Sequence, residues 1–183
     1  MKQTTKIHAV VFVLLITLGV VGRVAQPAWC FTPLAAVTLF AGYFLASPLV
    51  AALVPLSILA VVDWWLPGYA SHGVMLAVYT AALFPVLLGR FLRRRPTATR
   101  LATTAVLPAI FFSLTTNLGV WLFQDMYPKT FAGLIACYVA AIPFLRNMLA
   151  GDVFYVGVVF GCAYLATLPV PRKTRVRIVA NNR

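Results

Sequence analysis

FVLLITLGVV, residues 12–21, and LIACYVAAI, residues 134–142, are continuous apolar runs in which polar and apolar side chains do not alternate. The whole chain of 183 residues is 62% hydrophobic and 10% charged, with a mean hydropathy of +0.94. These values lie far outside the range of soluble domains, so the chain is predicted to be an integral membrane protein. Continuous runs favour helices, because a transmembrane β-strand would alternate and a helix satisfies its own backbone in lipid.

The chain contains seven apolar segments, two of which include these runs. We expect all but one of them to cross the membrane, which gives about six transmembrane helices and one short half-helix over residues 130–145. That segment ends at Ile142-Pro143, and the residue before a proline is pushed out of helical geometry, so the chain is expected to turn there. The segments are 7–22, 33–46, 48–62, 74–92, 101–123, 130–145 and 149–168.

The distribution of basic residues is the reason for expecting a half-helix. If 130–145 dips in and returns, 12 of the 15 basic residues face the cytoplasm, as the positive-inside rule requires. Both termini and the loop 90–100 are then cytoplasmic, and Arg23, Lys129 and Arg146 lie outside. A full crossing would place the basic tail 172–183 outside. We therefore expect one transmembrane domain over 1–171, followed by this cytoplasmic tail, in a bacterial inner membrane.

Two ambiguities concern the first third of the chain. Residues 33–62 form two short blocks parted by Ser47-Pro48, which fit either a tight hairpin or one long helix kinked at Pro48. The hairpin is preferred, because Ser-Pro is a common turn. The first 22 residues also resemble a signal peptide, but Arg23 follows the run directly and no clean cleavage site is present. An uncleaved first span is expected.

The net charge of +12 bears on partners. Because the basic residues sit beside apolar spans rather than on a soluble face, they are predicted to contact anionic lipids and not nucleic acid. A cytoplasmic protein partner is the alternative. The three cysteines, Cys30, Cys137 and Cys162, share no C-x-x-C spacing and do not indicate a disulfide framework.

The predicted outer loops hold the unusual chemistry of the chain. TTNLGVWLFQDMYPKT, residues 115–130, combines an amide, an aspartate and two large aromatics in an otherwise apolar sequence. Tryptophan and tyrosine near span ends are also explained by an aromatic belt at the lipid boundary. That belt does not explain Asn117 or Asp152, which would be costly facing lipid. We expect a small-molecule site under these loops, formed by Trp29, Asp63, Trp64, His72, Asn117, Trp121, Tyr127, Tyr138, Asn147 and Asp152.

Within that site, Asn117 and Trp121 share a helix face, so one can hydrogen-bond the ligand while the other stacks on it. Tyr138 is expected to face inward from the half-helix, with Asn147 and Asp152 near the pocket floor.

No catalytic pattern is present. The chain has three acidic residues and two histidines, no H-E-x-x-H, no G-x-S-x-G and no glycine-rich phosphate loop. A metal cluster of Cys30, Asp63 and His72 is an alternative use of the outer face. We expect a protein that is not an enzyme and that carries no cofactor.

The order of segments resembles the membrane-embedded substrate-binding (S) component of energy-coupling-factor (ECF) vitamin transporters, in particular an uncharacterised bacterial family of such proteins. The pieces that carry the resemblance are WCFTPLAAVTLFAGYF, LSILAVVDWW, FFSLTTNLGVWLFQDMYPKTFAGLIACY and AAIPFLRNMLAGDVFY. The resemblance implies an S-component-like helical bundle in which Asn117 and Trp121 line the pocket. The first span lacks the alanines four apart through which S-components contact the energising subunit.

The expected function is capture of a small, vitamin-like organic molecule by a membrane-embedded binding or transport protein. An energising transmembrane or ATPase module, or another membrane subunit, would be its partner, although action without a partner stays open. The alternative is a non-transporting membrane subunit that scaffolds a cytoplasmic or membrane partner.

Overall fold

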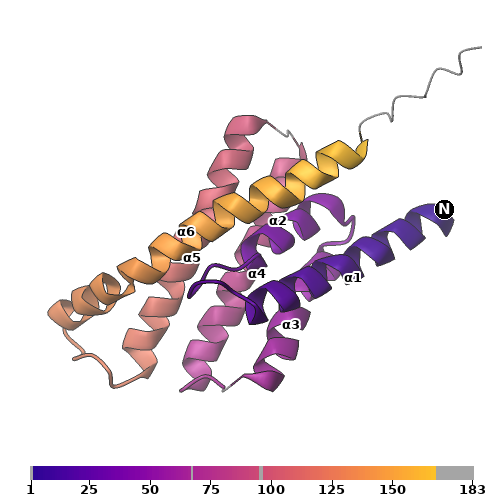
Figure 1. The fold of residues 1–183 in the computed structure, drawn as a ribbon. Helices are drawn as coiled ribbons and strands as arrows, with labels where there is room; N and C mark the ends of the chain where they lie inside the picture. The colour runs from indigo at the N-terminus through magenta and orange to yellow at the C-terminus, as the bar shows by residue number, and fades with distance from the viewer. Residues whose placement is uncertain (1, 67, 95–96, 168–183) are drawn as a thin grey trace, which may run out of the picture.

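The chain is all-helical over the residues that the computed structural model describes, which are 2–66, 68–94 and 97–167 (Figure 1). These residues contain no strand. The predicted tail 172–183 lies outside the described residues. The helices are α1 (Lys2–Val24), α2 (Leu34–Phe44), α3 (Pro48–Trp65), α4 (His72–Arg94), α5 (Ala98–Phe123) and α6 (Phe131–Thr167).

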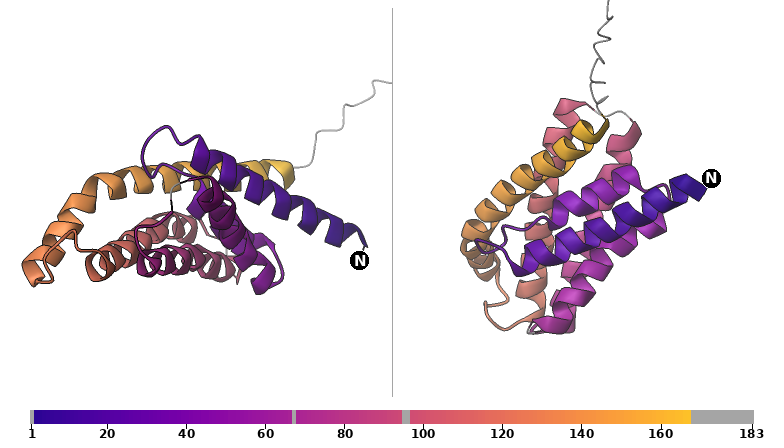
Figure 2. Two further views of the ribbon diagram at one scale, coloured as in Figure 1. Left: turned by 90° about the horizontal axis from the view of Figure 1, so that it is seen from below. Right: turned by 45° about the vertical axis from the view of Figure 1, so that its right-hand side comes forward.

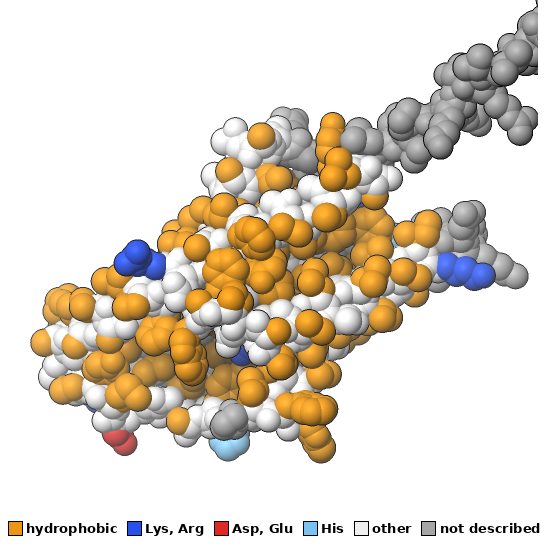
Figure 3. Space-filling view, viewed as in Figure 1, with side chains coloured by type: hydrophobic (Ala, Val, Ile, Leu, Met, Phe, Trp, Pro, Cys, Tyr) orange, Lys and Arg blue, Asp and Glu red, His pale blue; other side chains and the backbone are white. Residues whose placement is uncertain are grey.

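Most of these helices suit a bilayer. Five described helices, all except α2, are long and apolar enough to cross a membrane by length and composition. Many large apolar side chains point outward, among them Val13 and Leu14 on α1, which are 60% and 61% exposed. The face seen in Figure 3 carries many hydrophobic side chains, and most of its few charged side chains lie near the margins. Such a surface indicates a multi-pass membrane protein, because only lipid can cover it favourably.

The short helix α2 lies at the centre of the bundle. Eight of its 11 residues are buried, and it packs against every other helix. Its approach to α4 needs glycine on both sides, since a Cβ on Gly42 would lie 2.1 Å from the Val86 carbonyl oxygen and one on Gly89 would lie 2.0 Å from the Leu39 carbonyl oxygen. An 11-residue helix is only about 17 Å long, so α2 is too short to cross a hydrocarbon core of about 30 Å, although the sequence predicts a span over 33–46.

The break between α2 and α3 is where the sequence predicts it. Leu45 and Ser47 both have extended backbone, and the Ser47 hydroxyl accepts a hydrogen bond from the Val50 amide at 3.4 Å, with Pro48 as the first helical residue. Arg93 on α4 donates to the Leu45 carbonyl oxygen at 3.4 Å. Residues 33–62 therefore form two helices packed together rather than one kinked helix.

The predicted turn after Ile142 is wrong. α6 continues through Pro143 for 37 residues, and its N-terminal part curves toward α5 (Figure 2). A proline removes one helical hydrogen bond, here to the Val139 carbonyl, and bends a helix without having to end it. The half-helix and the last span are thus one helix about 55 Å long.

The two parts of α6 pack on different neighbours. Cys137 and Tyr138 contact carbonyl oxygens of α5, whereas Val156 packs with Ala36 and Leu39 of α2. Because α5 and α6 run in opposite directions, α6 ends on the same side of the bundle as the link between α4 and α5 (Figure 1).

Candidate functional site

A cavity of about 280 Å³ lies where the segment 25–33 covers the N-terminal turns of α2. It is lined from five helices and from the links that follow α1 and α3, so residues far apart in the sequence meet there. The lining residues are Arg23, Gln26, Trp29, Cys30, Thr32, Leu34, Ala35, Thr38, Leu66, Ala81, Ala82, Pro85, Pro108, Phe112, Met148 and Asp152.

Two charged side chains of the cavity have buried atoms without a hydrogen-bond partner. Asp152 on α6 is 3% exposed, and its Oδ2 atom contacts no donor. Arg23, in the last turn of α1, has a buried Nε atom that contacts no acceptor. Over the described part of the chain, these two residues form no ion pair with each other. Burying a charge without a partner costs free energy, which makes this pair unusual in a folded core.

The segment 25–33 is held over the cavity by specific contacts. The Gln26 side-chain oxygen accepts from the Cys30 amide at 3.2 Å, and Asn147 on α6 donates to the Trp29 carbonyl oxygen at 3.1 Å. Cys30 has a φ of 65°, a conformation that costs free energy for any residue other than glycine. A strained residue fixed by several contacts at a cavity wall is typical of a binding site.

The Cys30 thiol also has an altered acidity. Burial raises its pKa, and the nearby Arg23 guanidinium partly opposes that shift. The thiol is therefore protonated at neutral pH and behaves as a weakly polar wall of the cavity rather than as a nucleophile.

The far wall is formed by prolines inside helices. Pro85 lies in α4 and Pro108 in α5, and both line the cavity. Because proline has no N–H, Pro85 leaves the Ala81 carbonyl without its usual helical donor. Ala81 itself lines the cavity.

Comparison with known proteins gives the family. Residues 3–174, almost the whole chain, match the family of unknown function DUF6580. The chain belongs to DUF6580. No curated protein and no solved structure matches it.

In this DUF6580 chain, the structure brings few of the ten predicted ligand residues together. Trp29 and Asp152 line the cavity, and Asn147 contacts it indirectly through the Trp29 carbonyl. The remaining seven do not line it. They are Asp63, Trp64, His72, Asn117, Trp121, Tyr127 and Tyr138.

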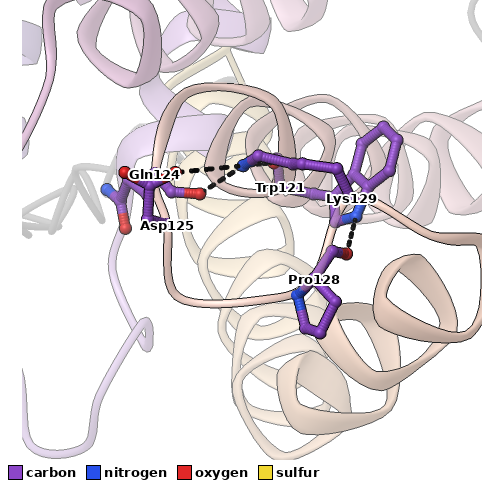
Figure 4. A network of polar contacts seen from close by, with 5 residues as sticks. All are labelled: Trp121, Gln124, Asp125, Pro128 and Lys129. Atoms are coloured by element: carbon purple, nitrogen blue, oxygen red, sulfur yellow. Dashed lines mark hydrogen bonds and ion pairs between the residues drawn. The ribbon is translucent and has the colours of Figure 1, made fainter.

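The polar residues of the window 115–130 instead contact one another at the end of α5 and in the link to α6 (Figure 4). Trp121 donates from its indole nitrogen to the Pro128 carbonyl oxygen at 2.9 Å. The Lys129 ammonium donates to the Trp121 and Gln124 carbonyl oxygens and pairs with Asp125 at 4.0 Å. A cation at the C-terminal end of a helix satisfies carbonyls that have no helical donor. The polar residues of this window therefore stabilise the C-terminal end of α5.

Asn117 and Tyr138 also donate hydrogen bonds to backbone carbonyl oxygens of α5. The Asn117 amide nitrogen donates to the Ser113 carbonyl oxygen at 2.7 Å, and the Tyr138 hydroxyl donates to the Leu114 carbonyl oxygen at 2.9 Å. Asn117 and Trp121 share one side of α5, as predicted, but this side packs toward α6 and the link rather than toward the cavity.

The other predicted residues lie around the ends of α3 and α4. Asp63 accepts hydrogen bonds from Tyr69 and Tyr79, whereas Trp64 is 87% exposed and His72 is exposed at the start of α4. An exposed tryptophan at a helix end fits the aromatic belt. Tyr127 is half-buried in the link between α5 and α6. Cys30, Asp63 and His72 form no metal cluster, and no other such group of three occurs among the described residues.

The sequence reasoning missed Arg23 as a site residue. The sequence counts Arg23 only among the basic residues placed outside and uses its position after the first apolar run as an argument against a signal peptide. A signal was present, since an isolated ionisable residue beside an apolar span commonly faces the bundle interior. Thr38, Pro85 and Phe112 carry no comparable signal, because each looks like an ordinary residue of an apolar helix.

Proposed function

We propose that the protein is a membrane-embedded substrate-binding protein that captures a small organic molecule in the cavity beneath segment 25–33 and passes it across the bilayer. The observation that carries this proposal is the cavity itself, to which Asp152 and Arg23 each contribute one buried polar atom without a hydrogen-bond partner. Ligand sites are typically largely apolar cavities with a few convergent polar groups. The apolar wall of Leu34, Pro108 and Phe112 fits that description.

The size of the cavity limits the ligand. At about 280 Å³ it is near the lower end of ligand sites, which run from roughly 300 to 1,000 Å³. A molecule with one or two small rings fits this space, whereas a large macrocycle does not. A compact vitamin-like molecule is therefore the proposed substrate class.

We propose the same topology as the charge distribution predicts, with both termini and the loop 90–100 in the cytoplasm. The segment 25–33 then lies at the outer side, so the cavity takes its ligand from outside. Cysteines introduced singly as Met126→Cys and Thr97→Cys into a cysteine-free background test this orientation. Labelling of residue 126 alone by an impermeant reagent is expected, and labelling of residue 97 alone would reverse the orientation.

The resemblance to S-components supports transport in cooperation with an energising module. It rests on the sequence pieces named above, and the cavity under an outer segment agrees with that class of protein. If the protein works in this way, the energy comes from its partner, because the sequence contains no glycine-rich phosphate loop of its own.

A second candidate function, scaffolding of a membrane partner, has one observation in its favour. Gly157 and Gly161 are four residues apart on α6, and a Cβ on either would meet nothing within 4 Å. Small residues at this spacing allow another helix to approach closely. Stable co-purification of a partner, with no effect of any ligand on the melting temperature, would favour this function over substrate binding.

The test of substrate binding combines native mass spectrometry with thermal melting of the gently purified protein. A retained small molecule is expected, and adding it back to stripped protein should raise the melting temperature. Ala35→Leu, which fills the cavity, should abolish both results. Ala136→Leu, on an exposed position of α6, is the matched control and should change neither. Equal ligand retention by the two variants would exclude the cavity as the site.

A further inference from the structure

Asp152 and Arg23 are the features of the cavity from which more can be inferred about its ligand. Asp152 lies in the second half of α6, beside Gly151, where a Cβ would come within 3.2 Å of the Phe31 Cα atom. This close contact fixes Asp152 against the segment that covers the cavity. Its carboxylate is 3% exposed and has an Oδ2 atom without a donor.

Arg23, in the last turn of α1, lacks a hydrogen-bond acceptor, whereas Asp152 lacks a donor. Its Nε atom is buried and has no acceptor, and the same cavity contains it. The two side chains are an acid and a base, yet they are not paired with each other within the described chain. Neither of the two buried atoms is therefore satisfied by the other residue, and each is costly to leave without a partner.

Two other polar side chains of the cavity already make hydrogen bonds within the chain. The Thr38 hydroxyl donates to the Leu34 and Ala35 carbonyl oxygens, at 2.8 and 3.0 Å. The Gln26 side-chain oxygen accepts from the Cys30 amide. The strongest unmet polar requirements of the cavity are therefore a donor for Asp152 and an acceptor for Arg23.

We infer that the ligand is a compact molecule with an N–H donor, which binds Asp152, and a separate oxygen acceptor, which binds Arg23. This inference rests on the proposed function and adds the chemical class of the substrate. Both contacts are charge-assisted hydrogen bonds, which are stronger and more selective than neutral ones. The apolar body of the ligand lies against Phe112 and the proline wall.

Two kinds of molecule have this chemistry. One is a zwitterion with an ammonium and a carboxylate, and the other is an uncharged nitrogen heterocycle that has N–H and C=O groups. They differ in how strongly they depend on the charge of Asp152. An ammonium loses an ion pair when the aspartate becomes asparagine, whereas a neutral N–H still finds an acceptor oxygen there.

The first experiment is a melting-temperature screen of the full-length wild-type protein in detergent. The probes are free α-amino acids, amines that lack a carboxylate, carboxylates that lack an amine, and small heterocycles such as uracil, cytosine and hypoxanthine. Compounds with both groups are expected to raise the melting temperature, and compounds with only one group are expected to have little effect. Equal stabilisation by one-group compounds would overturn the inference and leave the cavity as a binding site.

The second experiment measures the affinity of the best compound for four variants. Asp152→Asn and Arg23→Gln are each expected to weaken binding of a zwitterion by at least about tenfold, corresponding to one lost charge-assisted bond. A heterocycle should lose clearly less in Asp152→Asn than in Arg23→Gln. The matched controls Asp125→Asn and Arg146→Gln change exposed residues outside the cavity and should bind as the wild type does.

The outcomes distinguish a wrong ligand class from a wrong binding site. If Asp152→Asn and Arg23→Gln bind like their controls while Ala35→Leu does not bind, the cavity is the site but the ligand does not bridge the two charges. If no probe stabilises the wild type and native mass spectrometry finds no retained molecule, both the ligand class and the proposed function are wrong.

Discussion

Asp63 and Asp152 are two of the three acidic residues of the chain, and the structure treats them in opposite ways. Asp63, near the end of α3, is half-buried and accepts from the Tyr69 hydroxyl at 3.2 Å and from the Tyr79 hydroxyl at 2.8 Å. Asp152, in α6, is fully buried and has an oxygen without any donor. The first carboxylate joins three parts of the fold, and the second faces a cavity.

This difference teaches how to separate structural from functional polar groups in an apolar bundle. A carboxylate whose acceptor positions are filled by the protein stabilises the fold and has little left to offer a ligand. A buried carboxylate without a partner lowers stability, and such a cost is typical of a site that awaits its substrate. Sequence alone marks Asp152 as costly facing lipid and predicts both aspartates as ligand residues, but it does not show which of them has its acceptor oxygens filled by the protein.

The largest expected effect is on the Asp63 side of this comparison. Asp63→Ala removes the acceptor of two tyrosine hydroxyls and should lower the free energy of unfolding by about 2 kcal/mol. Asp63→Asn keeps one acceptor oxygen and should lose about half as much. Thermal melting in detergent measures both. An alanine variant as stable as the wild type would mean that the tyrosines do not depend on Asp63.

Asp152 should respond with the opposite sign. Asp152→Asn has nearly the same shape and removes a buried charge, so the ligand-free protein should be as stable as the wild type or more stable, by about 1 kcal/mol. The measurement is the melting temperature of stripped protein. A marked loss of stability would show that Asp152 has a structural role like that of Asp63.

The acidity of Tyr69 sharpens the comparison at the Asp63 side. Burial raises the pKa of Tyr69, and the negative charge and hydrogen bond of Asp63 raise it further. The folded state therefore holds this proton more tightly than the unfolded state. Its contribution to stability is complete below the ordinary tyrosine pKa of about 10 and is lost as the pH rises through the raised pKa.

Absorbance titration of tyrosinate tests this point. The Asp63→Asn variant should ionise Tyr69 at lower pH than the wild type, but still above the ordinary value because the burial remains. Tyr69→Phe is the control that removes the contribution of Tyr69 from the titration curve. An unchanged titration curve in Asp63→Asn would contradict the contact.

The smallest effect is expected at Asp125, the remaining acidic residue. Its side chain is fully exposed, and its only described contact is the ion pair with Lys129 at 4.0 Å. Surface pairs of this kind contribute little, so Asp125→Asn should leave the melting temperature unchanged within error. Lys129→Met should destabilise more, because it also removes the donor to the Trp121 and Gln124 carbonyls. Equal effects of the two substitutions would assign the stabilisation to the ion pair.

The sequence predicted most of the helices because their causes are local. Apolar runs long enough for a bilayer mark the long helices, and Ser47-Pro48 supplies a hydroxyl cap and a preset first residue for α3. The prediction failed at Pro143, where the local preference of the residue before a proline was weaker than the helical hydrogen bonds on either side of it.

The site was predictable only in part, for a related reason. Trp29 and Asp152 were identified by side chains that are costly or unusual near lipid. Asn117 and Trp121 gave the same signal but satisfy carbonyls of their own helix and of the adjacent link. A polar residue in an apolar run needs a partner, and the sequence does not say whether that partner is the backbone or a ligand.

By itself, the sequence determined that the chain forms long apolar helices, because the transfer free energy of each apolar segment acts on that segment separately. Only the tertiary structure decided that α2 lies at the centre, that α6 passes unbroken through Pro143, and that Arg23 and Asp152 share one cavity without pairing. These features depend on how helices pack against one another, through close approaches such as that of Gly42 to Val86. Packing of this kind joins residues that no local rule connects.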